Sequence, residues 1–166
     1  MKPRVYIAGK IGPNDFRHDI VPSLRGHTWQ DGPLECRNFI YTGPFFVSCS
    51  HRCAHTAGSH GAGRIDGEGC EIGYVTQEEI YRSNQAAIDA SDVVFAYIDG
   101  IECYGTQFEI GWAAKAGKPI YVCLSPEMDR REFWYGLQAA RRVRERIVSR
   151  EDLPKHFAEL IAGIKK

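Results

Sequence analysis

The chain has 166 residues, 43% of them hydrophobic and 25% charged, which is typical of one globular domain (residues 1–166) with a sizeable core. Its 21 basic and 21 acidic residues balance, so no overall field favours a nucleic-acid polymer or an anionic membrane. The sequence lacks an apolar run of the roughly 20 residues that a membrane span needs, and its first residues do not have the apolar h-region expected of a signal peptide. We therefore expect a cytoplasmic protein whose six cysteines do not form disulfides.

The first predicted strand covers residues 4–8 and ends in a glycine-containing turn over residues 9–13. In that turn, Gly9 would let backbone N–H groups approach a ligand closely. Lys10, which follows, could meet a 5′-phosphate. The alternative is a plain strand-to-helix turn with a solvated lysine.

A helix and a second strand are predicted before residue 48. Asn14 or Asp15 can cap a helix that continues to about residue 25. After a polar, turn-rich stretch, residues 38–47 (NFIYTGPFFV) form a strand that Gly43-Pro44 interrupts. Because proline cannot donate a ladder hydrogen bond, we expect this strand to lie away from the centre of the sheet.

Residues from about 27 to 75 form a Cys/His-rich insertion, part of which has almost no side chains able to build a core. Cys49, Cys53 and His55 lie at short spacing within it, and Cys36 lies upstream. Zinc prefers such thiolate and imidazole ligands, so we predict a structural zinc site from these residues. The spacing matches no standard zinc finger. The alternative is a Gly/His-rich active-site loop with unligated thiols.

The second half of the chain alternates helices and strands. A helix over residues 76–90 opens with a Thr-x-x-Glu capping box. Residues 93–98 (VVFAYI) form the apolar run typical of a strand buried on both faces of a parallel sheet. A helix from about residue 104 to 116 and a strand over residues 119–124 follow. Ligands of such strand–helix–strand units bind beyond the carboxyl ends of the strands.

The remaining elements are less regular. We expect a helix over residues 126–144, a short edge strand over residues 146–148 and an amphipathic helix over residues 149–166. Nothing in the terminal helix suggests chemistry.

Two motifs resemble a known family. Residues 105–111 (GTQFEIG) and 117–119 (GKP) are similar to the core motif of the nucleoside 2-deoxyribosyltransferases, as are residues 5–9 (VYIAG) and 84–92. The resemblance implies a flavodoxin-like, doubly wound parallel α/β sheet. It also implies an enzyme of nucleotide metabolism that needs no organic cofactor, and a homo-oligomer in which a second subunit completes the pocket.

Glu109 matches the family's nucleophile, which attacks C1′ of the sugar and forms a glycosyl-enzyme intermediate. The alternative is an early-helix glutamate favoured by the helix macrodipole. The resemblance implies that Asn84 helps to hold the nucleobase or the catalytic carboxylate, and we expect Asp99, which is close in sequence, to be a further catalytic residue. The substrate-binding positions predicted here are Tyr6, Gly9, Lys10, Cys103, Gly105, Thr106 and Trp134.

One position departs from the family pattern. Cys103 stands where the family usually has an aspartate that assists the binding or protonation of the base. A thiol protonates a base less readily than a carboxylic acid does. Asp99 and Glu102 are close enough in sequence to substitute.

Three functions remain open at this point. The first is cleavage or transfer of a nucleoside's N-glycosidic bond. The second is hydrolysis of a nucleoside 5′-monophosphate, with Lys10 at the phosphate. The third is a non-catalytic nucleotide-binding or partner-binding module that uses the Cys/His insertion, a possibility that the cysteine at position 103 favours.

Overall fold

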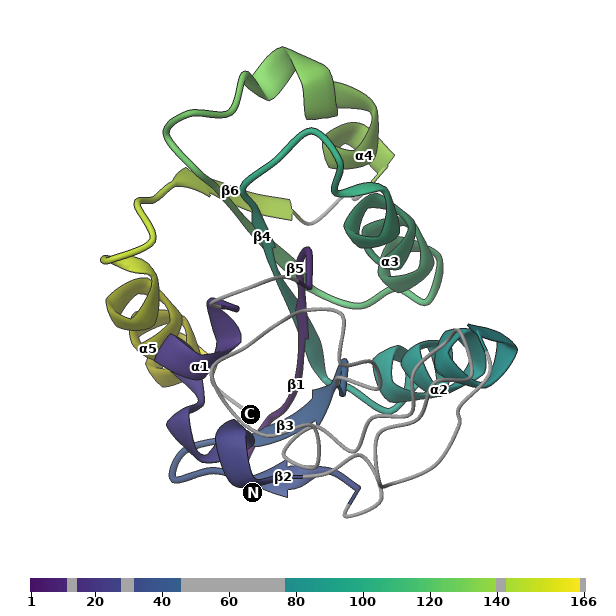
Figure 1. Cartoon of the computed structure of the whole chain (residues 1–166), viewed down its shortest axis with the longest axis vertical. Helices are drawn as coiled ribbons and strands as arrows, with labels where there is room; N and C mark the ends of the chain where they lie inside the picture. The colour runs from purple at the N-terminus through teal and green to yellow at the C-terminus, as the bar shows by residue number, and fades with distance from the viewer. Residues whose placement is uncertain (12–14, 28–31, 46–76, 140–142, 165–166) are drawn as a thin grey trace, which may run out of the picture.

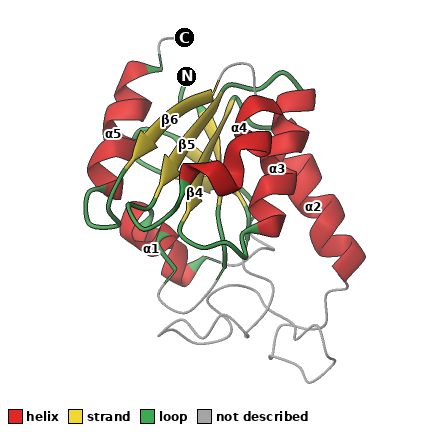
Figure 2. Ribbon diagram, turned by 90° about the horizontal axis from the view of Figure 1, so that it is seen from above, coloured by secondary structure: helices red, strands yellow, loops and turns green. Residues whose placement is uncertain are grey.

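A computed structural model describes residues 1–11, 15–27, 32–45, 77–139 and 143–164. They form a six-stranded sheet with helices on both faces (Figures 1 and 2). The strand order is β2-β3-β1-β4-β5-β6, and neighbouring strands are parallel except for the β2–β3 pair at the edge. Without β2, this is the order of flavodoxin-like folds. The α/β prediction is therefore confirmed, whereas most of the Cys/His insertion lies outside the described residues.

The elements have the following bounds. The strands are β1 (Arg4–Ala8), β2 (Leu34–Glu35), β3 (Ile40–Gly43), β4 (Val93–Ile98), β5 (Ile120–Leu124) and β6 (Val143–Ile147). The α-helices are α1 (Arg17–Ile20), α2 (Gln77–Asp89), α3 (Tyr104–Lys115), α4 (Trp134–Ala139) and α5 (Leu153–Gly163). Two 3₁₀ helices, η1 (Pro22–Gly26) and η5 (Arg130–Phe133), precede β2 and α4 respectively.

The central strands agree with the sequence pattern. β1 and β4 have the predicted bounds, and every residue of β4 is buried. The turn after α3 contains Gly117, which adopts a positive φ of 69° that favours glycine at a helix C-terminus.

The structure corrects the predicted strand over residues 38–47. β3 is shorter and lies inside the sheet, between β2 and β1. Pro44 follows the last residue of β3 through a cis peptide bond, so the proline occupies no position in the ladder. The edge strand β2 was not predicted at all.

Two predicted helices are also corrected. The helix that was expected to reach residue 25 ends at Ile20, because Pro22 cannot donate a helical hydrogen bond and instead begins η1. The helix expected over residues 126–144 is wrong beyond α4, since β6 already begins at Val143. β6 does lie at the edge of the sheet, parallel to β5.

Each face of the sheet has its own core. Val5 and Ile7 of β1 pack with residues of α1 and α5, whereas Tyr6 and Ala8 pack on the side of α2, α3 and α4. Successive residues of a strand point to opposite faces, so this alternation directs Tyr6 toward α3. In the described ranges, no helix has the length and apolar character needed to cross a membrane.

Helices α2 and α3 are tied together at one end. Lys118 Nζ donates hydrogen bonds to the carbonyls of Asp89 (2.5 Å) and Ser91 (2.7 Å), which lie at the turn between α2 and β4. Trp112 Nε1 of α3 donates to Asp89 Oδ1 at 2.9 Å. The lysine of the Gly-Lys-Pro motif therefore holds the turn that places α2 beside α3.

Candidate active site

Glu109 lies in the second turn of α3, and its side chain is partly buried. Tyr6 Oη, from the fully buried side chain on β1, donates a hydrogen bond of 2.5 Å to Glu109 Oε1. The two residues are 103 positions apart in the sequence. Two of the predicted site residues are thus in direct contact.

The surroundings of Glu109 favour its protonated form. Burial raises the pKa of the carboxyl to about 7, against the smaller opposing effects of the Tyr6 hydrogen bond and the positive charge of Arg17. Burial and the nearby Glu109 raise the pKa of Tyr6 well above its usual value, so the phenol stays a hydrogen-bond donor. Near neutral pH the carboxyl can therefore exist in both protonation states.

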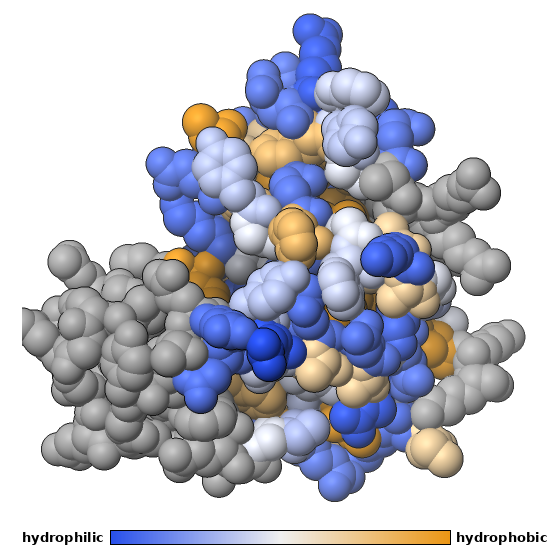
Figure 3. Space-filling view, turned by 90° about the vertical axis from the view of Figure 1, so that its right-hand side faces the viewer, coloured by the Kyte–Doolittle hydropathy of each residue, from blue (hydrophilic) through white to orange (hydrophobic). Residues whose placement is uncertain are grey.

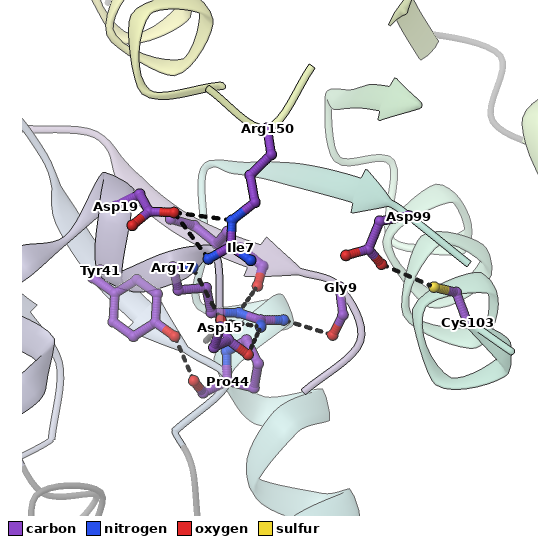
Figure 4. Close-up of polar contacts among 10 residues, drawn as sticks. All are labelled: Ile7, Gly9, Asp15, Arg17, Asp19, Tyr41, Pro44, Asp99, Cys103 and Arg150. Atoms are coloured by element: carbon purple, nitrogen blue, oxygen red, sulfur yellow. Dashed lines mark hydrogen bonds and ion pairs between the residues drawn. The ribbon is translucent and has the colours of Figure 1, made fainter. Parts of the chain in front are cut away.

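A buried ion pair holds the turn that follows β1 (Figure 4). Arg17 Nη1 contacts Asp15 Oδ1 at 2.9 Å and Oδ2 at 2.8 Å. The same guanidinium donates from Nε to the Ile7 carbonyl (2.8 Å) and from Nη2 to the Gly9 carbonyl (2.6 Å). The sequence predicted Asp15 only as a helix cap, and it did not predict that Arg17 is buried. A charged residue in a helix is normally expected to lie in solvent.

Gly9 has no room for a side chain. A Cβ there would lie 2.5 Å from the Phe16 ring and 3.1 Å from the Tyr97 carbonyl oxygen. The next residue, Lys10, is exposed and forms an ion pair of 2.6 Å with Glu102 of the loop between β4 and α3. This ion pair joins the two loops that follow the carboxyl ends of β1 and β4.

The loop between β4 and α3 contains the departure from the family pattern. Cys103 is buried, and its Sγ donates to Asp99 Oδ1 at 3.8 Å (Figure 4). Burial raises the pKa of this thiol, so it stays protonated. Asp99 itself is exposed at the end of β4. Thr106 is buried and Gly105 is exposed in the first turn of α3.

The remaining predicted positions lie on α2 and α4. Asn84 is partly buried on α2, and Trp134 is 61% exposed at the start of α4. Between described residues, no hydrogen bond joins Glu109 to Asn84, Asp99 or Thr106. The structure therefore supports the Tyr6–Glu109 and Asp99–Cys103 contacts, while the roles of Asn84, Thr106 and Trp134 stay predictions.

The predicted zinc ligands cannot be assembled from the described residues. Cys49, Cys53 and His55 lie outside them, and within them no group of three Cys, His, Asp or Glu residues could hold a metal ion. Cys36 is described, and its carbonyl accepts a hydrogen bond of 2.8 Å from Lys2, just before β1. Cys36 therefore lies near the amino end of β1, away from Glu109, and the zinc site stays a prediction.

Two cavities lie between α5 and the sheet, on the face opposite α3. One, of about 130 Å³, is lined by β4, β5, β6 and α5, and another, of about 370 Å³, by α1, η1, the β2–β3 region and α5. Cys36 is the predicted site residue that lines the second. The candidate active site is therefore identified by the polar contacts around Glu109 and not by these cavities.

Comparison with known proteins identifies the family of the chain. The family model of nucleoside 2-deoxyribosyltransferase matches residues 49–150, which include Asn84, Asp99 and Glu109. A solved structure, Clostridium botulinum CMP N-glycosidase BcmB, matches with a TM-score of 0.50 and 16% identity over 93% of this chain and 98% of that chain, which shows a shared fold. No curated protein matches the sequence. Because the family match spans more than half of the residues, the chain belongs to the nucleoside 2-deoxyribosyltransferase family, whose chemistry is the cleavage or transfer of N-glycosidic bonds.

Proposed function

We propose that this protein is an enzyme that cleaves the N-glycosidic bond of a nucleoside or nucleotide, with Glu109 as the nucleophile. The observation that carries the proposal is the Tyr6–Glu109 hydrogen bond, next to the turns that follow β1 and β4. Ligands of open α/β sheets bind at the carboxyl ends of the strands, so the carboxyl of Glu109 is at the expected place. Its raised pKa is typical of a functional carboxyl.

In the first step, the carboxylate of Glu109 attacks C1′ while the bond from C1′ to the base nitrogen breaks. The electron pair of that bond leaves with the base, which takes up a proton, and a glycosyl ester of Glu109 forms. Tyr6 holds one carboxylate oxygen and thereby orients the group. We assign Asp99 and Asn84 to the departing base, since Cys103 is a poor acid in its buried setting.

In the second step, water or a second base attacks C1′ and displaces the Glu109 carboxylate. Water gives a free sugar and makes the enzyme a hydrolase, whereas an acceptor base gives a new nucleoside and makes it a transferase. The contacts around Glu109 are compatible with both outcomes. The acceptor therefore has to be established by measurement.

The decisive experiment is a chromatographic assay for free base. Wild-type protein and Glu109→Gln are incubated with pooled nucleosides and pooled 5′-monophosphates, with and without an acceptor base. We expect base release that falls by at least about a thousandfold in Glu109→Gln. Glu159→Gln, an exposed position on α5, is the matched control and should keep full activity. No release from any pool would instead favour the non-catalytic binding module.

A 5′-monophosphate is the second candidate substrate. Lys10 stands in the turn after β1, where its ammonium group is already paired with Glu102, and a phosphate could replace that carboxylate. The BcmB match also points to a monophosphate, because that protein is named as a CMP N-glycosidase. If this is correct, Lys10→Met should lower kcat/KM for CMP by about tenfold or more and leave kcat/KM for cytidine unchanged.

We also propose the structural zinc site on the basis of the sequence alone. Elemental analysis of the purified protein should find about one zinc per chain, and Cys49→Ser/Cys53→Ser should lose it. Metal-free wild-type protein would leave the Gly/His-rich active-site loop as the better interpretation of this segment.

A further inference from the structure

Arg17 and Asp15 form the most deeply buried ion pair among the described residues whose exposure is given, and both side chains are fully shielded from solvent. Burying two charges costs free energy that their mutual attraction offsets only with good geometry and further hydrogen bonds. Apolar residues of similar size often serve stability equally well. Stability alone therefore does not explain this buried ion pair.

The place of the guanidinium suggests that role. Arg17 belongs to α1, which covers the face of the sheet opposite α3, yet it reaches the carboxyl end of β1 (Figures 1 and 4). There it donates to the carbonyl of Ile7, the residue after Tyr6, and to the carbonyl of Gly9, two residues further on. Tyr6 in turn donates to Glu109. A short chain of contacts thus leads from the ion pair to the nucleophile.

The charge of Arg17 also acts on the site. Burial raises the pKa of both Tyr6 and Glu109, and Arg17 lowers both against that larger effect. Among the described residues, Tyr6 from β1 and Arg17 from α1 act on the pKa of Glu109, and Glu109 in turn acts on the pKa of Tyr41 from β3. Arg17 is the cation in this set.

We propose that Arg17, oriented by Asp15, is a positioning residue of the active site that fixes the end of β1 under Tyr6 and favours the carboxylate form of Glu109. The inference rests on the proposed role of Glu109. Asp15 accepts from Nη1 of Arg17 at both carboxylate oxygens, which leaves Nε and Nη2 for the two carbonyls, and a lysine could not reproduce this fork of donors.

The test replaces the pair without leaving a lone buried charge. Asp15→Asn/Arg17→Met is neutral and similar in size, and the asparagine can still accept the backbone N–H bond that Asp15 now accepts from residue 17. The matched control is Asp19→Asn/Arg150→Met, which removes the half-exposed ion pair of 3.0 Å that α1 forms with the segment after β6. Both double variants remove one arginine and one aspartate.

Two readouts separate positioning from plain stability. The first is kcat/KM against pH, whose acidic limb should lie near pH 7 in the wild type because the nucleophile must be ionised. The second is the titration of the Glu109 carboxyl by ¹³C NMR, assigned by the signal that Glu109→Gln removes. In Asp15→Asn/Arg17→Met we expect both to move up by about one pH unit, and kcat to fall about tenfold, while the control behaves as wild type.

Arg17→Lys separates geometry from charge. It keeps the cation but not the fork, so we expect the pH limb to stay near its wild-type position while kcat falls. If the double variant does not fold, Arg17→Lys still tests the positioning role. Wild-type kcat in Arg17→Lys would then overturn the positioning role.

The failure of this inference differs from the failure of the proposed function. A folded Asp15→Asn/Arg17→Met protein with wild-type kcat, pH limb and Glu109 titration would show that the pair is merely structural. If wild-type protein releases no base from any substrate, the proposed function fails. The NMR titration still tests the influence of Arg17 on Glu109, and an unchanged titration would contradict it.

Discussion

Glu109 combines a partly buried carboxyl with a tyrosine donor that cannot readily lose its own proton. This arrangement holds the proposed nucleophile in place but makes its ionisation costly. In the unfolded chain a glutamate has its ordinary pKa of 4.5, whereas in the folded protein the pKa of Glu109 is about 7. The contribution of Glu109 to folding stability therefore falls as pH rises from the first value to the second.

Glu109→Gln should accordingly stabilise the protein, but only where wild-type Glu109 is ionised. We expect a gain in the free energy of unfolding on the order of 2 kcal/mol at pH 8, and about none at pH 4, where the wild-type carboxyl is protonated. Urea unfolding of both proteins at the two pH values checks this. An equal gain at both values would mean that Gln improves packing and that the ionisation of Glu109 costs nothing.

Gly9 is a second residue whose identity the surroundings dictate. Gly9→Ala should lower the free energy of unfolding by about 1–3 kcal/mol, because its Cβ would collide with the Phe16 ring and crowd the Tyr97 carbonyl. The matched control is Gly111→Ala, where a Cβ meets open space within a helix. That substitution should instead stabilise by about 0.5–1 kcal/mol. Thermal unfolding of the two variants measures the contrast.

At the level of elements, the site depends on how α2 and α3 are placed against the sheet. Both helices join β4, one before and one after it. Lys118 closes the turn between α2 and β4, and Trp112 of α3 contacts the last residue of α2. The Gly-Lys-Pro motif that marks the family in the sequence thus has a structural explanation here.

Lys118→Met should destabilise the protein by about 1–3 kcal/mol, because the carbonyls of Asp89 and Ser91 would lose a charged donor. Lys155→Met, an exposed lysine on α5, should change stability by less than about 0.5 kcal/mol. Chemical unfolding followed by far-UV circular dichroism compares the two. If both substitutions changed the free energy of unfolding equally, the hydrogen bonds of Lys118 would not contribute to stability.

At the level of the whole molecule, α2, α3 and α4 form one face, on which Figure 3 shows apolar and pale side chains scattered among hydrophilic ones. Large apolar side chains are exposed on it: Tyr81, Tyr104, Phe108, Trp134 and Tyr135. Exposed aromatic groups are enriched at protein interfaces, and this face lies beside the helix that carries Glu109. We therefore propose that a second copy of the chain covers it.

The oligomer prediction can be tested by light scattering after size exclusion. Wild-type protein should form a homo-oligomer, and Phe108→Ser/Trp134→Ser should shift it toward monomers and reduce base release. Ile147→Ser, at an exposed apolar position on β6, is the control and should leave both unchanged. A wild-type protein that stays monomeric at every concentration would contradict the proposal.

Much of the local structure could be predicted from the sequence. The apolar runs predicted β1, β4 and β5, because strands buried on both faces need side chains that satisfy two cores. The GTQFEIG motif placed Glu109 early in α3 and indicated its chemistry. The ends of α1 and α4 were misjudged, since apolar spacing continues through Pro22 and through the start of β6 without showing that the chain changes direction.

The sequence by itself thus determined the order of the central elements and the family, and it predicted Glu109 as the nucleophile, because these follow from patterns within short windows. Only the tertiary structure decided that Tyr6 meets Glu109 across 103 residues and that a buried arginine reaches from α1 to the end of β1. It also decided that β3 runs inside the sheet with Pro44 just past its end. These features depend on contacts between distant segments, which hydrophobic periodicity and local propensity do not record.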